Sequence, residues 1–341
     1  MKGVVYLGDS KVEVRDFPRP EPGLGQVVTE MKVAGLCGSD LHKYHSSQKW
    51  ARGRKGMISG HEPTGVVAEV GLNVEHISVG DRIAVYHRVG CGRCADCMSG
   101  NDVFCYTSGA FGRTQDGSHA DYMLADARHC LPLPDDISFA VGTQLACTAG
   151  TAFSALGKIP AHSGDTLVVF GLGPVGLAAL LMGMGMGYRG IGVEIQPYRI
   201  KLAQQVGQGD VINAEEDDPV TVIKELSGGK GCGGVIECSG SPIARKQAAA
   251  VASRGATVVY VGEGHPHITV NFGDVLGKDL TLRANSVYSV RHYFEAVAFL
   301  GRHPVPLDDI VTHRYKIEQA VEAFSTFDQG ETGKVIFEWE N

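Results

Sequence analysis

Apolar and polar residues alternate over most of the first 135 residues, in short runs separated by Gly, Pro, Asn and Asp. The runs QVVTEMKVAG, TGVVAEVG and DRIAVYHRV are representative. An alternation of period two buries one face of a strand, and frequent turn residues join such strands into hairpins. This part of the chain is therefore predicted to form an antiparallel barrel or sandwich.

The pattern changes near Ile137, where apolar residues begin to recur at helical spacing. From Asp165 onward, the predicted strands DTLVVFG, RGIGVEI, GGVIECSG and ATVVYVGEG alternate with the predicted helices GPVGLAALLMGMG, PYRIKLAQQVG and PIARKQAAAVASRG. This alternation predicts a parallel sheet with right-handed crossovers. Two further helices, YFEAVAFLGR and IEQAVEAFSTF, and a last strand, GKVIFEWE, are expected to return to the first domain. The fold class is therefore α/β, with a β-rich domain of residues 1–148 and 286–341 and a parallel-sheet domain of residues 149–285.

Composition excludes several classes of function. The net charge is −7 and no block of basic residues occurs, which argues against a nucleic-acid partner. No apolar run reaches the roughly 18 residues of a membrane span, and the N-terminus has no apolar secretory segment. We therefore expect a cytoplasmic protein without a membrane partner. In that compartment the nine cysteines are expected to serve as metal ligands or buried thiols rather than disulfides.

Four cysteines lie within fifteen residues, in the pattern C-x2-C-x2-C-x7-C. They are Cys91, Cys94, Cys97 and Cys105. Zinc favours four thiolates in a tetrahedron, and such a closed site is structural because no position is open to substrate. Closely spaced cysteines also hold iron–sulfur clusters, so the spacing leaves that alternative open. A nucleic-acid-binding zinc lobe is disfavoured because the segment contains one Arg and no Lys.

Other candidate metal ligands are scattered along the chain. Cys37 stands in GLCGSDLHKYH, His61 and Glu62 in GHEPTG, and Cys147 in QLACTAG. A catalytic zinc needs three protein ligands and an open position, and the ligands commonly come from different loops. Taken singly, each of these residues fits equally well as an ordinary buried side chain.

A glycine-rich loop, GLGPVG, joins a predicted strand to a predicted helix. Gly171 allows the tight turn, Gly173 admits a pyrophosphate and Gly176 lets the helix pack against the strand. Pro174 and Val175 begin the helix, whose first backbone N–H groups would face the phosphates. Glu194 closes the next strand, where a carboxylate accepts hydrogen bonds from the ribose and repels a 2′-phosphate. NAD is therefore expected to be preferred to NADP.

The motifs CGSD and GHEPTGVVAEVG, the four-cysteine segment and GLGPVG together extend over nearly the whole chain. In combination they resemble the zinc-dependent medium-chain alcohol dehydrogenases. The resemblance implies a GroES-like catalytic domain and a Rossmann domain, and two zinc ions per chain. It assigns Cys37, His61 and Cys147 to the catalytic zinc, with Glu62 just behind the metal. Polyol and threonine dehydrogenases place an acidic residue as the third ligand, so Cys147 favours the alcohol dehydrogenase pattern without excluding polyols.

The same resemblance implies roles for three residues that follow Cys37. Ser39 would take the proton of the alcohol, because a hydroxyl both accepts and donates hydrogen bonds. His42 would pass that proton to water, for which a pKa near neutrality is suitable. Asp40 would fix the tautomer of a ligating histidine, although an Asp after Gly-Ser also suits a simple turn.

Two further regions complete the expected site. Arg199 matches a basic position of the family that contacts the adenosine ribose. The family's pocket wall includes the residue four before the first cysteine of the cluster, which here is His87, and Tyr86 precedes it. A polar wall suggests a polar or polyhydroxylated substrate.

These features predict an NAD-dependent zinc alcohol dehydrogenase acting on a secondary, cyclic or polyol substrate. The alternatives are a zinc-free quinone or enone reductase on the same scaffold and a nucleotide-binding protein without turnover. The family resemblance suggests a homodimer or homotetramer through the Rossmann domains, with pairing near the strand VYVGEG.

Overall fold

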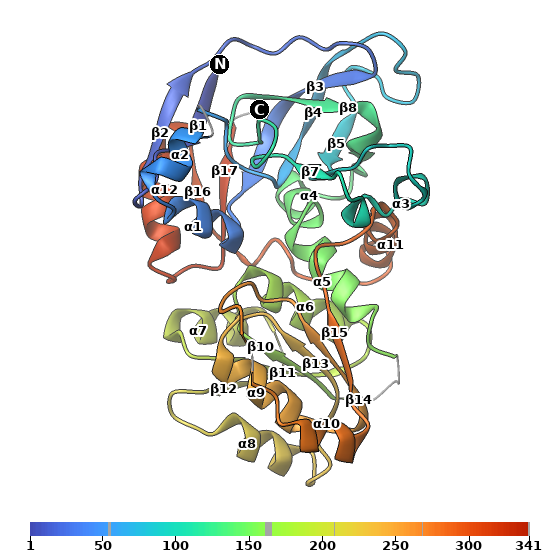
Figure 1. Cartoon of the computed structure of the whole chain (residues 1–341), viewed down its shortest axis with the longest axis vertical. Coiled ribbons are helices and arrows are strands. Elements are labelled where there is room, and N and C mark those ends of the chain that lie inside the picture. The colour runs from blue at the N-terminus through green and yellow to red at the C-terminus, as the bar shows by residue number, and fades with distance from the viewer. Residues whose placement is uncertain (54–55, 161–165, 208, 268, 340–341) are drawn as a thin grey trace.

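The computed structural model describes residues 1–53, 56–160, 166–207, 209–267 and 269–339. Two sheets form the two halves of the molecule, one above the other in Figure 1. The upper half contains the first and the last strands of the described chain. Asp165, the expected first residue of the parallel sheet, lies outside the described residues.

The upper sheet has seven strands, and all its pairings but one are antiparallel. Its order is β16–β17–β3–β4–β5–β9, with β8 also paired to β3. The strands are β3 (Gln26–Gly35), β4 (Pro63–Val70), β5 (Arg82–Val85), β8 (Tyr122–Asp126), β9 (Cys130–Pro132), β16 (Val311–Tyr315) and β17 (Lys334–Glu338). Ile336 pairs with Gly35, so the last strand returns to the first domain as predicted.

Shorter elements surround this sheet. They are the hairpin β1 (Lys2–Tyr6) and β2 (Val12–Asp16), the ribbon β6 (Arg88–Val89) and β7 (Gly109–Ala110), and the helices α1 (Gly38–Tyr44), α2 (Gln48–Gly53), α3 (Ala95–Met98), α11 (Val290–Leu300) and α12 (Ala320–Asp328). Helices α4 (Phe139–Leu145) and α5 (Thr148–Leu156) lead into the lower half, with a 51° bend between them. In the described part of the chain, this bent pair matches a membrane span in length and composition, whereas no single helix does.

The lower sheet is entirely parallel, in the order β12–β11–β10–β13–β14–β15. Its strands are β10 (Thr166–Phe170), β11 (Arg189–Glu194), β12 (Asp210–Asn213), β13 (Cys232–Glu237), β14 (Ala252–Tyr260) and β15 (Thr281–Ala284). Its helices are α6 (Pro174–Gly185), α7 (Pro197–Val206), α8 (Pro219–Leu226), α9 (Pro242–Val251) and α10 (Phe272–Lys278). This is the doubly wound arrangement that the strand–helix alternation predicts.

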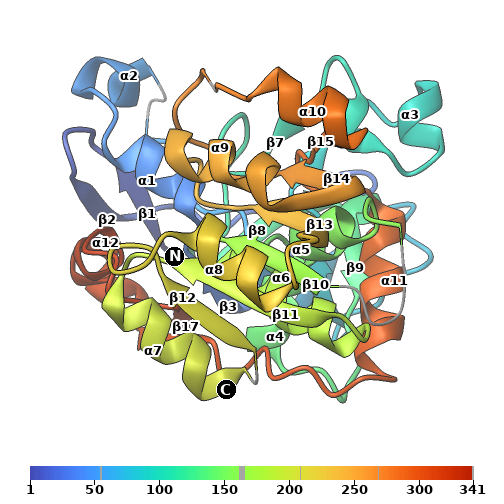
Figure 2. The same ribbon diagram turned by 90° about the horizontal axis from the view of Figure 1, so that it is seen from below.

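Apolar side chains cover both faces of the parallel sheet. One core joins α5, α6 and α7 to one face, and a second core joins α8 and α9 to the other. Figure 2 shows α8 and α9 in the view from below. Helices α6 to α9 all begin with proline at the first turn, where the missing N–H has no helical partner to lose.

The strand named in the expected assembly, VYVGEG, begins one strand inside an edge of the parallel sheet. Strand β14, which contains the first residues of VYVGEG, pairs with β13 on one side and β15 on the other. It therefore has no free edge for a partner subunit. The outer strand at this edge of the sheet is β15, whose four residues are all exposed, and β12 forms the opposite edge.

Candidate active site and metal sites

The four clustered cysteines form a compact group in the loop between β6 and β7. Their sulfur atoms all lie within 4.8 Å of one another, and Cys97 Sγ is 3.9 Å from Cys91 Sγ and 3.4 Å from Cys94 Sγ. Tetrahedral zinc with Zn–S bonds of about 2.3 Å separates its sulfurs by about 3.8 Å. An iron–sulfur cluster would need wider spacing, because several iron atoms stand between the cysteines. The group therefore fits one zinc ion.

The loop that carries these cysteines is fixed to its surroundings by a buried carboxylate. Asp102 Oδ1 accepts hydrogen bonds from Gly90 N at 3.1 Å and Arg128 Nη2 at 2.6 Å. Val290 N, at the start of α11, donates to Gly100 O at 3.0 Å. These contacts tie the loop to the catalytic domain, as a structural site requires.

A second group of donors comes from three distant segments. The donor atoms of Cys37, His61, Glu62 and Cys147 all lie within 4.8 Å of one another. Cys37 follows β3, and His61 and Glu62 precede β4. Because these strands pair with Ala34 opposite Pro63, the two segments meet. Cys147 precedes α5, at the bend after α4, and so reaches the same point.

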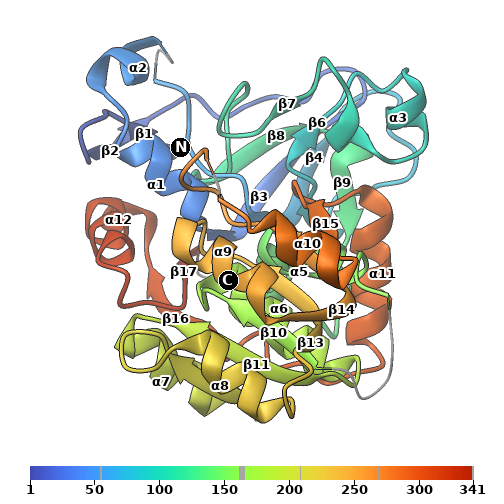
Figure 3. The same cartoon turned by 60° about the horizontal axis from the view of Figure 1, so that its bottom comes forward.

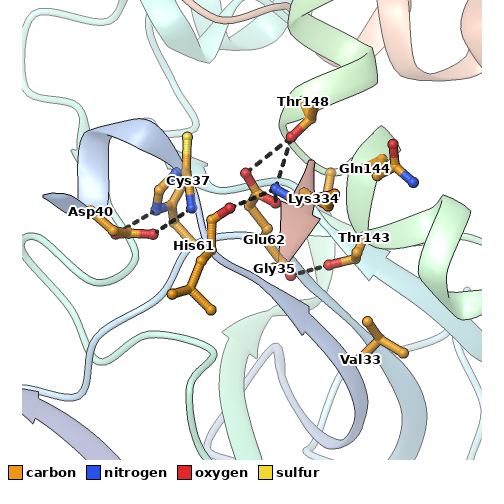
Figure 4. A network of polar contacts seen from close by, with 12 residues as sticks. Val33, Gly35, Cys37, Asp40, His61, Glu62, Thr143, Gln144, Thr148 and Lys334 are labelled. Carbon is orange, nitrogen blue, oxygen red and sulfur yellow. Dashed lines mark hydrogen bonds and ion pairs between the residues drawn. The ribbon is translucent and has the colours of Figure 1, made fainter. Parts of the chain in front are cut away.

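Asp40 orients the histidine of this group (Figure 4). Its carboxylate lies 3.3 Å from Nδ1 of His61, and it accepts hydrogen bonds from the backbone N–H of Cys37 and the hydroxyl of Tyr6. His61 therefore has Nε2 left for a metal. Burial opposes ionisation of Asp40, but His61 and Lys43 nevertheless hold its pKa well below the usual range. A fully buried carboxylate with these partners fits the orienting role better than that of a surface turn.

The pKa values of the two thiols of the group are shifted in opposite directions. Hydrogen bonding to Cys147, and also to His61, holds the pKa of Cys37 well below its ordinary value, although burial opposes this. The pKa of Cys147 is raised by the same hydrogen bond and by burial. These opposite shifts make Cys37 the more readily ionised of the two thiols, and thiolate is the form that binds zinc. With the imidazole of His61, this donor set fits a zinc ion.

Glu62 has a partner that the sequence reasoning missed. Its carboxylate forms a fully buried ion pair with Lys334 and accepts a hydrogen bond from Thr148 Oγ1 at 3.2 Å. Burial raises the pKa of Glu62 to about 7, against the attraction of Lys334. The only signal in the sequence was a lysine at the start of the otherwise apolar run KVIF.

The two residues of the expected proton path have different environments: Ser39 lies beside the proposed metal ligands, and His42 lies at the surface. Ser39 Oγ is 3.5 Å from Nε2 of His61, beside the metal ligands. His42 is 58% exposed, and its Nε2 lies 3.9 Å from Oε2 of Glu263. Within the described residues no hydrogen bond joins Ser39 to His42. Figure 3 shows that α1, which carries both residues, lies beside the segment after β14.

His87 lies against the ligand group, with its ring centroid 5.3 Å from that of His61. Its Nδ1 donates a hydrogen bond to Ala146 O at 3.0 Å, so Nε2 is an acceptor. Burial lowers the pKa of His87 to about 3, and the ring is neutral. Tyr86 differs from the expectation, because it is fully buried and its hydroxyl donates to Tyr288 O. It supports the site from the core and does not line a pocket.

The glycine loop has the geometry of a phosphate cradle. Gly171 has a φ of +80°, which glycine adopts without strain, and a side chain at Gly176 would stand 1.8 Å from Gly171 O. Gly173 precedes α6, which begins at Pro174 and Val175. The backbone N–H groups at this helix start are available to an anion.

The acidic and basic residues beside this loop are both held in place. The carboxylate of Glu194 accepts hydrogen bonds from the backbone N–H groups of Leu172, Ile195 and Gln196. Arg199 donates from Nε to Thr332 O at 3.1 Å, and burial lowers its pKa. Arg199 also lies beside Gly173, because a Cβ there would stand 3.8 Å from its guanidinium.

Comparison with known proteins agrees with this architecture. Residues 23–135 match the model of the alcohol dehydrogenase GroES-like domain, and residues 174–302 match that of the zinc-binding dehydrogenase. The uncharacterized zinc-type alcohol dehydrogenase-like protein YphC of Escherichia coli K12 is 35% identical, with 97% of each chain covered. The chain belongs to the zinc-dependent medium-chain dehydrogenase/reductase family.

Two further similar proteins carry names that state an enzyme activity. The sorbitol dehydrogenase of Halalkalibacterium halodurans is 32% identical, with 98% of each chain covered. The structure of the alcohol dehydrogenase TADH from Thermus sp. ATN1 superposes with a TM-score of 0.89 at 26% identity, with 99% of each chain covered. The predicted fold class, a GroES-like domain with a Rossmann domain, is confirmed, and the chain is an oxidoreductase of the zinc-type alcohol dehydrogenase family.

Proposed function

We propose that this protein oxidises a polar secondary, cyclic or polyol alcohol to the ketone or aldehyde by transferring a hydride to NAD. The observation that carries the proposal is the convergence of Cys37, His61 and Cys147. Two thiols and an imidazole from separate segments would provide the three protein ligands of a catalytic zinc, with the Glu62 carboxylate also within 4.8 Å of these donors. The second zinc is assigned to the four-cysteine loop.

When bound, zinc supplies a Lewis acid that lowers the pKa of the alcohol. The chain's own residues prepare the reaction. Asp40 keeps the ring of His61 in one orientation, and Ser39 stands beside that ring, where its hydroxyl can accept the proton of the substrate. His42 is exposed and can release a proton to water. The proposal includes transfer of the substrate's proton from Ser39 to His42.

The proposed preference for NAD over NADP rests on Glu194. Three backbone N–H groups hold its carboxylate at the end of β11, and a carboxylate has about four acceptor sites. One site is therefore left for a ribose hydroxyl, whereas a 2′-phosphate would meet a fixed negative charge. Arg199 is expected to contact the same ribose.

The proposed substrate class rests on His87. A neutral imidazole with Nε2 as an acceptor can receive a hydrogen bond from a second hydroxyl of the substrate. The similarity to a sorbitol dehydrogenase supports a polyol, and the cysteine at position 147 also leaves simple alcohols as candidates. A panel of primary, secondary, cyclic and polyol alcohols, followed at the absorbance of NADH, would identify the class.

The experiment that tests the proposal combines metal analysis with one variant. We expect two zinc ions per chain in the unmodified protein. We expect Cys37→Ser to lose NAD-dependent oxidation while its circular dichroism spectrum stays unchanged. A zinc-free quinone reductase would retain activity in that variant. A non-catalytic nucleotide-binding protein would bind NAD without oxidising any alcohol of the panel.

We also propose a cytoplasmic homo-oligomer, without nucleic-acid or membrane partners. Strand β15 is one of the two edge strands of the parallel sheet, and Phe272 and Leu276 on the adjacent α10 are also exposed. Pairing of two β15 strands would cover this edge in a dimer. Sedimentation of the purified protein would distinguish monomer, dimer and tetramer. The domain limits proposed from the sequence, 149–285 for the Rossmann domain, contain all six parallel strands.

A further inference from the structure

Lys334 contacts a neighbour of each proposed catalytic zinc ligand. Its ammonium donates hydrogen bonds to Leu36 O at 2.9 Å and Thr148 Oγ1 at 3.0 Å, and it forms the ion pair with Glu62. Leu36 directly precedes Cys37, Glu62 directly follows His61, and Thr148 directly follows Cys147. One side chain therefore joins the three segments that carry the ligands.

The contacts match the chemistry of an ammonium group. Lysine has three N–H donors and no acceptor, and Lys334 meets three acceptors from three segments. The side chain is fully buried, so water does not compete for these donors. Strand β17 places it there, because its pairing with β3 brings Lys334 to the end of that strand.

The backbone of β3 also provides space for this ion pair. A Cβ added at Gly35 would stand 2.2 Å from Oε2 of Glu62, 2.8 Å from Cε of Lys334 and 3.0 Å from its Nζ. A side chain at this position would displace the pair. The glycine that opens the motif GLCGSD therefore has a steric role in the same arrangement.

We propose that Lys334 is a positioning residue that fixes the three ligand-bearing segments relative to one another and so sets the affinity of the catalytic zinc site. This inference rests on the proposed function, since it takes Cys37, His61 and Cys147 as the ligands. Residues that hydrogen-bond to the ligands themselves typically contribute 10- to 100-fold to metal affinity, and we expect a loss in the same range when the segments that carry the ligands are no longer joined.

A simpler role for Lys334 would be to neutralise the buried charge of Glu62. The two roles make different predictions for a protein that lacks both charges. The double variant Glu62→Gln/Lys334→Met leaves no unpaired buried charge, and neutral replacement of a buried ion pair is often tolerated by the fold. If neutralisation were the whole role, this variant would retain its zinc affinity.

The test measures both zinc sites of the same molecule by competition with a chelator of known affinity. In Lys334→Met and in the double variant, we expect zinc to bind 10- to 100-fold more weakly at the catalytic site and unchanged at the four-cysteine loop. After replacement of the catalytic zinc by Co2+, the visible absorption bands should also shift or broaden. The double variant keeps the test decisive if Lys334→Met does not fold.

A matched control is available in the Rossmann domain. Lys278 Nζ donates to the backbone oxygens of Ala249 at 3.3 Å and Ala250 at 2.8 Å, and Lys278→Met should leave both zinc affinities unchanged. If the affinity of the double variant for the catalytic zinc lies within threefold of that of the unmodified protein, the positioning role is overturned and the proposed function is not affected. An unmodified protein that binds zinc only in the four-cysteine loop would overturn the proposed function as well.

Discussion

Replacing His87 by phenylalanine should change substrate preference with little effect on the fold. The replaced ring donates one hydrogen bond, from Nδ1 to Ala146 O. That oxygen also accepts a hydrogen bond from the hydroxyl of Tyr288 at 2.7 Å, so it retains a partner in the variant. The loss is then one hydrogen bond, which contributes about 1 kcal/mol to the free energy of unfolding.

The effect on catalysis follows from the lost acceptor. Nε2 of His87 would accept one hydrogen bond from a second hydroxyl of the substrate, a contribution of about 0.5–1.5 kcal/mol. For a diol, kcat/KM should therefore fall about 2- to 12-fold more than for the matched monoalcohol. The pair butane-2,3-diol and butan-2-ol differs by one hydroxyl and suits this comparison. An equal fall for both alcohols, or no fall, would refute the role of His87 in recognition.

The same variant gives a pH test of stability. Burial lowers the pKa of His87 to about 3, so the folded protein keeps the ring neutral while the unfolded chain takes up a proton below about 6.5. Unfolding is therefore favoured as the pH falls from 6.5 towards 3, by about 2 kcal/mol at pH 5. Urea unfolding at pH 7.5 and pH 5 should show a loss of stability on acidification that is about 2 kcal/mol smaller in the His87→Phe protein. An identical loss would show that the ring is not buried in a neutral state.

Two other predictions concern the cofactor and the structural metal. Glu194→Ala should lower the ratio of kcat/KM for NAD to that for NADP by about tenfold or more, since removal of one charge repulsion of about 1.4 kcal/mol gives that factor; an unchanged ratio would show that another residue selects the cofactor. Cys97→Ser should reduce zinc to one ion per chain and lower the temperature of unfolding, because a structural zinc contributes directly to folding. Retention of two zinc ions by that variant would contradict the assignment of the loop.

The course of the chain was predictable from the sequence wherever an element buries a regular apolar face. Strands β10, β11, β13 and β14 are largely buried and were predicted from short apolar runs. Helix α10 and strand β15 were not predicted, because α10 has no buried residue and Thr281–Ala284 are all exposed. Both elements are also short, with seven and four residues, and β15 is placed by its pairing with β14.

The candidate active site was proposed only through resemblance to a family. Cys37, His61 and Cys147 have no informative spacing, because strand pairing and a helix bend bring them together. Lys334 was missed because a lysine at the start of a strand usually lies in solvent. Tyr86 was taken with His87 as part of the pocket wall, but its fully buried ring and the hydrogen bond from its hydroxyl to Tyr288 O depend on a segment that is distant in the sequence.

The two zinc sites should respond differently to loss of metal. Contacts of Asp102 and Gly100 tie the four-cysteine loop to the rest of the domain, but its four sulfurs contact one another, and a bound zinc ion would replace these contacts by four bonds to the metal. The catalytic ligands are held by contacts that do not involve metal, with Asp40 fixing His61 and Lys334 joining all three segments. Buried ion pairs are costly to form and are retained here beside the ligands, which is consistent with a site arranged before the ion binds. Chelation should therefore destabilise the protein mainly through the loop, while the catalytic site remains ready to bind zinc again.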